Sequence, residues 1–79
     1  MHMESVSNIK QDIFALLARY FGEVTEKTFK EFYIDETLPV TIDASVRILQ
    51  DLIGRPKAIT ELNRILVRHN MQEISNENH

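Results

Sequence analysis

Residues 42–66 are IDASVRILQDLIGRPKAITELNRIL, and two helix-like segments meet in this stretch at Gly54. Before Gly54 and after Pro56, apolar residues recur every three or four positions, which is the spacing of one face of an α-helix. Proline is tolerated in the first turn of a helix, where its missing N–H would have no partner. The sequence therefore predicts two helices, at about residues 42–53 and 56–70, that pair as a helical hairpin.

The same helical period occurs twice in the chain before residue 42. Apolar side chains recur on one face between Ile9 and Tyr20, and Gly22 follows where a helix commonly ends in a left-handed residue. A second amphipathic segment comes directly after this glycine. We therefore expect helices over about residues 8–21 and 26–36, which form a second helical hairpin.

Hydroxyl and carboxylate side chains stand where these helices could begin, and such side chains can accept the free N–H groups of a first turn. The predicted caps are Ser7, Thr25 and either Thr41 or Asp43. Val24 and Phe29 occupy the two positions of a hydrophobic staple around the start of the second helix.

Length and composition allow one small domain. The chain has 79 residues, 43% of them hydrophobic, and no cysteine, which excludes disulfides, thiolate zinc sites and cysteine nucleophiles. The predicted fold class is all-α, a compact bundle of four short helices in a single domain spanning residues 1–79. Residues 1–6 and 72–79 are expected to be disordered tails, and residues 1–2 look like a cloning remnant.

The sequence also bears on the cellular location of the protein. The longest stretch dense in apolar residues, 13–21, has nine residues and contains an arginine, whereas a membrane-spanning helix needs about 20. We expect no membrane association, and the absence of cysteine and of a leader fits a cytoplasmic protein.

No motif in the chain points to catalysis. The three histidines, at positions 2, 69 and 79, do not have metal-ligand spacing, and the sequence contains no glycine-rich phosphate loop or nucleophile motif. Asp35, Glu36 and Asp43 are explained by helix-end solvation and capping. We therefore expect no enzyme, no catalytic or metal-binding residue, no cofactor and no small-molecule substrate.

The aromatic residues suggest a function. All six fall between positions 14 and 33, which is more ring surface than four short helices easily enclose. A domain this small commonly gains support from another chain. We therefore expect a non-catalytic interaction or regulatory module that binds a protein partner or, more simply, forms a homodimer through aromatic surface of the first two helices. The expected interface residues are Phe21, Phe29, Phe32 and Tyr33, with Arg64 and Arg68 at the edge. A monomer that buries all its rings is the alternative.

A second function remains open. Residues 46–62 resemble the first part of helix-turn-helix units, whose second helix presents a polar face to a DNA groove. Residues 44–71 carry five basic and two acidic residues, whereas residues 1–43 carry four basic and eight acidic ones. This polarity fits a DNA-binding, transcription-regulatory domain, or association of the acidic half of one chain with the basic half of another. The expected DNA contacts are Arg55, Lys57, Thr60, Arg64 and Arg68.

Overall fold

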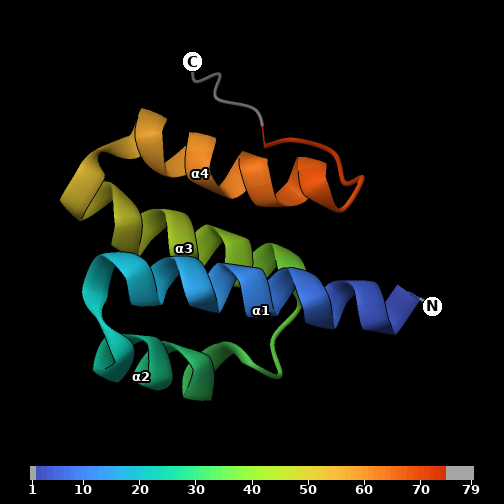
Figure 1. Ribbon diagram of the computed structural model, residues 1–79, viewed down its shortest axis with the longest axis horizontal. Coiled ribbons are helices and arrows are strands. Elements are labelled where there is room, and N and C mark those ends of the chain that lie inside the picture. The colour runs from blue at the N-terminus through green and yellow to red at the C-terminus, as the bar shows by residue number, and fades with distance from the viewer. Residues whose placement is uncertain (1, 75–79) are drawn as a thin grey trace.

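The computed structural model describes residues 2–74 of the chain, with side chains from residue 6 onward, and these residues form four helices. The helices are α1 (His2–Phe21), α2 (Glu23–Tyr33), α3 (Leu38–Ile53) and α4 (Arg55–Arg68). Figure 1 shows α1 and α3 in the middle of the molecule, with α2 and α4 on opposite sides of them. The predicted all-α bundle of two helical hairpins is confirmed.

Each hairpin turns on one glycine. Gly22 separates α1 from α2 with a φ of 93°, and Gly54 separates α3 from α4 with a φ of 87°. Side chains other than glycine rarely adopt such angles, so these two positions mark helix boundaries that the sequence identifies correctly. Pro56 lies in the first turn of α4, as predicted.

The helix starts differ from the predicted ones. Ser7 lies inside α1, so it is not a cap. Thr25 lies in the first turn of α2, which begins directly after Gly22, so it is not a cap either. The third helix begins at Leu38 and is capped by Thr37, whose side-chain oxygen accepts the N–H of Val40 at 3.4 Å. Thr41 and Asp43 therefore belong to the helix interior.

The predicted tails fall partly within the described residues. Residues 2–6, expected in a tail, belong to α1, and Met71–Ile74 follow α4 as an ordered segment. Residue 1 and residues 75–79 lie outside the described residues. None of the helices within residues 2–74 is both long enough and apolar enough to cross a membrane.

The core is supplied mainly by three of the four helices. Its buried apolar residues are Ile9, Ile13, Phe14, Leu16, Leu17, Phe29, Leu38, Val46, Leu49, Ala58, Ile59, Leu62, Ile65 and Leu66. From α2 only Phe29 is buried in this cluster. Tyr33 of α2 packs partly against the core, whereas Val24 and Phe32 of the same helix remain at the surface.

Candidate protein-interaction surface

The most exposed large apolar side chains of the described residues lie on α2 and α3. Val24 is 82% exposed, Phe32 is 72% exposed and Leu52 is 54% exposed. Ile48 of α3 is partly buried and lies one helical turn from Leu52, on the same face of that helix. Val24, Phe32, Ile48 and Leu52 are called the α2–α3 surface below.

A shallow hollow joins the two helices across this surface. Its volume is about 270 Å³, and its lining residues are Val24, Thr25, Thr28, Phe29, Phe32, Tyr33 and Ile48. The hydroxyl group of Thr28 donates a hydrogen bond to the carbonyl oxygen of Val24 at 3.1 Å. This donor is therefore satisfied within α2, so Thr28 adds no unpaired hydroxyl group to the hollow. The surface therefore combines a projecting ring, Phe32, with a largely apolar depression beside it.

The aromatic residues predicted as one interface separate into buried and exposed groups. Phe29 is only 7% exposed and belongs to the core, where its ring meets Phe14 edge-on at 6.1 Å and Tyr33 at 4.5 Å between centroids. Phe21 and Tyr33 are half-buried against the same core. Of the four predicted interface rings, Phe32 alone is mostly exposed, whereas α2 turns the ring of Phe29 toward Phe14 of α1.

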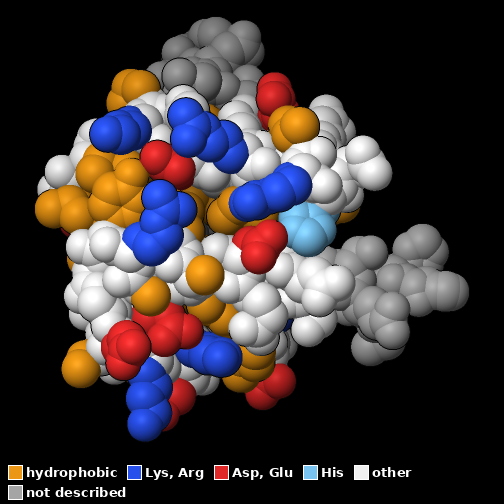
Figure 2. Space-filling view, viewed as in Figure 1, with side chains coloured by type: hydrophobic (Ala, Val, Ile, Leu, Met, Phe, Trp, Pro, Cys, Tyr) orange, Lys and Arg blue, Asp and Glu red, His pale blue; other side chains and the backbone are white. Residues whose placement is uncertain are grey.

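The two arginines predicted at the edge of this interface lie elsewhere. Arg64 and Arg68 line a cleft of about 420 Å³ between α1 and α4, together with Arg19, Asp12 and Glu61. Figure 2 shows basic and acidic side chains mixed over α1 and α4 on this face. Since α2 packs against α1 on the side away from α4, these arginines do not border the α2–α3 surface.

Polar contacts fasten α4 to α1 along the cleft. His69, which follows α4, places its Nε2 atom 2.8 Å from the Oδ2 atom of Asp12. The hydroxyl group of Tyr20 donates to Glu61 at 3.0 Å, and this bond, followed by partial desolvation and the charge of Glu61, raises the pKa of Tyr20. These carboxylates thus have structural partners, and His69 is partly buried and in hydrogen-bond contact with Asp12.

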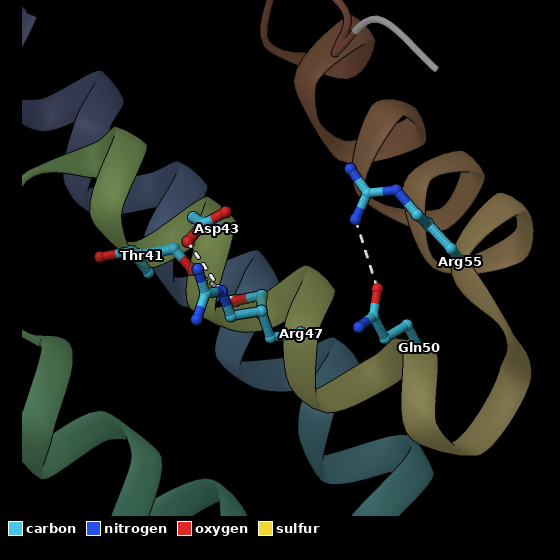
Figure 3. Close-up of polar contacts among 6 residues, drawn as sticks. Thr41, Asp43, Arg47, Gln50 and Arg55 are labelled. Carbon is cyan, nitrogen blue, oxygen red and sulfur yellow. Dashed lines mark hydrogen bonds and ion pairs between the residues drawn. The ribbon is translucent and has the colours of Figure 1, made fainter. Parts of the chain in front are cut away.

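The residues proposed for DNA contact all lie exposed on α4, but they are not arranged like a helix-turn-helix unit. Helix-turn-helix motifs join their helices by three or four residues, whereas Gly54 is the whole connection here. The Arg55 guanidinium donates to Gln50 at 3.3 Å, and the Thr60 hydroxyl donates to the Pro56 carbonyl oxygen at 3.0 Å (Figure 3 shows the first pair). Lys57 has no polar contact among the described residues.

The described residues contain no group of three or more histidine, cysteine or acidic side chains arranged to hold a metal ion. Asp43 pairs with Arg47 at 3.1 Å on α3, whereas the carboxylate partner of His69 is Asp12 of α1. The carboxylates singled out in the sequence therefore do not gather with His69 into one polar site.

Sequence reasoning missed the two residues that, with Phe32, make the surface most apolar. The sequence predicts Val24 in a hydrophobic staple, but α2 begins directly after Gly22, so Val24 lies in its first turn and is exposed to solvent. On α3 the apolar residues between Ile42 and Ile53, Leu52 among them, span an arc of about 200° of the helix circumference by the rule of 100° per residue. The width of that arc was the available signal, because two neighbouring helices cannot cover so much of one helix.

No protein-family model matches this chain, and neither a curated protein nor a solved structure matches it.

Proposed function

We propose that this chain is a non-catalytic protein-interaction module that forms a homodimer through the α2–α3 surface. The observation that carries the proposal is the exposure of Val24 and Phe32 on α2 beside a hollow that Ile48 of α3 also lines, with Leu52 exposed one helical turn from Ile48. Scattered apolar residues are normal on a protein surface, whereas a cluster beside a hollow is typical of an interface. The cysteine-free composition suits a cytoplasmic place of action.

A second copy is the partner favoured by the shape of the surface. A two-fold symmetric interface uses the same patch on both subunits, so a projection on one must meet a depression on the other. Phe32 is such a projection, and the hollow lined by Thr28 and Ile48 is such a depression. Each copy would insert Phe32 into the hollow of the other, which places an aromatic anchor at the centre of the contact.

The dimer is expected to be weak. A standard interface buries about 800 Å² on each partner, which is roughly a seventh of the 5437 Å² that the chain exposes. The four residues of the α2–α3 surface supply only a fraction of this area, and the polar flanks of both helices supply the rest. We therefore expect a dissociation constant of the dimer in the micromolar range. A regulatory module with such an affinity can exchange partners.

The test is a mass measurement by light scattering over a concentration series. We expect a mass that rises with concentration from 9.2 kDa toward twice that value. Phe32→Ser or Leu52→Ser should raise the dissociation constant of the dimer at least tenfold. Val67→Ser is the matched control, because Val67 is 51% exposed on α4, outside the surface, and its replacement should leave the mass curve unchanged. A constant mass of 9.2 kDa at every concentration would refute the proposal.

The same samples test the DNA-binding alternative. Titration with duplex DNA at two salt concentrations measures the phosphate contacts, since such binding weakens steeply as salt rises. Salt-sensitive binding that disappears in the Arg64→Ala, Arg68→Ala double variant, in a chain that stays monomeric, would favour DNA over self-association.

A further inference from the structure

Three arginines from two helices line the cleft between α1 and α4. Arg19 comes from the last turn of α1, and Arg64 and Arg68 lie one turn apart on the same face of α4. All three side chains are exposed, and the cleft opens on the face of the molecule that Figure 2 shows. A hydrogen bond to Glu61 raises the pKa of Tyr20, and the charges of two of these arginines, Arg19 and Arg64, oppose that rise. Guanidinium groups from different helices therefore act on the same hydroxyl group beside the cleft.

The two carboxylates of the cleft already have hydrogen-bond partners. Asp12 lies 2.8 Å from the Nε2 atom of His69. Glu61 accepts the hydroxyl group of Tyr20 at 3.0 Å. Arg68 reaches the carboxylate of Asp12 only at 3.9 Å, beyond hydrogen-bond distance, and the side chains of the other two arginines make no hydrogen bond or ion pair within the described part of the chain. The cleft therefore has more cations than anions, and its guanidinium donors are available to a ligand.

The lining of the cleft favours one compact anion. Its apolar residues are Ala15, Leu16 and Ile65, and core packing already buries Leu16 and Ile65. A ligand would therefore gain little from apolar contact and would meet mainly the exposed guanidinium groups. Asp12 on α1 and Glu61 on α4 would repel a chain of regularly spaced phosphates such as that of DNA. A single anionic group is thus a better match than a polyanion.

The openness of the cleft bears on what carries this anion. Sites for free small molecules commonly enclose most of the ligand. Exposed arginines at a surface cleft instead suit a charged group that another protein presents, and arginine clusters commonly recognise phosphorylated side chains in this way.

We propose that the α1–α4 cleft binds the phosphate monoester group of a phosphorylated side chain in a partner protein, through Arg19, Arg64 and Arg68. A planar guanidinium group presents two parallel N–H donors to an oxyanion. A phosphate monoester carries three strong acceptor oxygens and about two negative charges, so three guanidinium groups can share it, whereas a carboxylate has only two oxygens and a single charge. Since α2 packs against α1 on the side away from α4, this site is independent of the proposed dimer.

The test is a titration of the full ¹⁵N-labelled chain, at constant ionic strength, with the acetylated and amidated peptide alanine–phosphoserine–alanine. We expect saturable shifts of the backbone and guanidinium N–H signals of Arg19, Arg64 and Arg68, with a dissociation constant in the millimolar range for one charged group. Arg64→Gln should weaken binding about tenfold, because hydrogen bonds to a charged group are lost. Arg47→Gln is the matched control, since it removes the same charge from an exposed residue of α3 outside the cleft and should leave the affinity unchanged.

Three further ligands determine which anion and which carrier the cleft selects. The same peptide with glutamate in place of phosphoserine should bind severalfold more weakly, because it has fewer acceptor oxygens and less charge. Inorganic phosphate and duplex DNA are the other two. Circular dichroism confirms that each variant keeps its helices.

Several results would overturn the proposal. The phosphopeptide could produce no saturable shift, or Arg47→Gln could lose as much affinity as Arg64→Gln, which would indicate general attraction to a positive charge. Equal affinity for the glutamate peptide would exclude selection of phosphate. Binding of inorganic phosphate without binding of the phosphopeptide would exclude a partner protein, and shifts of the same arginine signals at lower concentrations of duplex DNA would assign the cleft to nucleic acid.

Discussion

The ammonium group of Lys10 on α1 lies 2.8 Å from the carbonyl oxygen of Ile34, the residue that caps the end of α2. The same group also donates to the carbonyl oxygen of Glu36. Lys10 is only 6% exposed, which is rare for a lysine. The free carbonyl groups at a helix end carry partial negative charge, so a cation satisfies them well. Lys10 thereby joins the middle of α1 to the turn between α2 and α3.

Replacement of this lysine tests that role. Lys10→Met keeps the length of the side chain but removes the donor, and we expect the free energy of unfolding to fall by about 1–3 kcal/mol, because two carbonyl oxygens lose their partner. Urea unfolding followed by circular dichroism measures the change. Lys27→Met, at an exposed position of α2, is the control and should alter stability by less than about 0.5 kcal/mol. Equal effects of the two substitutions would show that Lys10 is not a structural anchor.

Two phenylalanines with opposite burial give a second prediction. Phe14 is 1% exposed, whereas Phe32 is 72% exposed. Phe14→Ala should cost about 3–5 kcal/mol, as much as the whole stability of a domain this small, so we expect an unfolded chain. Phe32→Ala, measured at a concentration where the chain is monomeric, should change stability by less than about 0.5 kcal/mol. A large loss in Phe32→Ala under those conditions would mean that its ring supports the fold.

The helix ends could be predicted from the sequence better than the helix starts. Gly22 and Gly54 are the chain's two glycines, and each lies between amphipathic segments, so each marks a boundary unambiguously. Several hydroxyl and carboxylate side chains, in contrast, can cap a first turn. Thr37 caps α3 in place of Thr41 because the preceding turn ends there and because proline is accepted in a first turn. Which of these side chains caps the helix depends on the path of the preceding turn in the folded chain. The spacing of apolar residues in the sequence does not determine that path.

The candidate surface could be predicted only in part. Periodicity places Phe29, Phe32 and Tyr33 together on α2, and the structure turns Phe29 inward and Phe32 outward. The rotation of α2 about its axis is set by its packing on α1, including the edge-on contact of Phe29 with Phe14. Residue spacing could show that the helix was too apolar for its place in a small bundle. It could not show which ring would be left exposed.

The turn at Gly54 gives a third prediction. Its φ of 87° and ψ of 154° fall in a region that only glycine adopts readily, and an added Cβ atom would meet nothing within 4 Å. Gly54→Ala therefore tests backbone strain alone, and we expect a loss of about 1–3 kcal/mol in the free energy of unfolding. Asp51→Ala, at an exposed position of the preceding turn, should be nearly neutral. If thermal and urea unfolding show Gly54→Ala to be neutral as well, the hairpin tolerates another backbone path.

The contact between Tyr20 and Glu61 predicts how stability depends on pH in the alkaline range. The hydrogen bond to Glu61, then desolvation and the negative charge of Glu61, raise the pKa of Tyr20 in the folded chain above its ordinary value of about 10, although Arg19 and Arg64 oppose this effect. The neutral phenol is thus favoured by folding. Its contribution to stability is fully present below about pH 10 and is lost as the pH rises through the folded-state pKa.

Comparison with Tyr20→Phe isolates this contribution from the other titrating groups. The difference in the free energy of unfolding between wild type and Tyr20→Phe should be constant between about pH 7 and pH 9 and should shrink above about pH 10. Urea unfolding at each pH gives the difference, and Tyr33→Phe is the control, since no hydrogen bond from the Tyr33 hydroxyl occurs among the described residues. A difference that grows with pH would reverse the sign of the linkage and exclude the Tyr20–Glu61 hydrogen bond in solution.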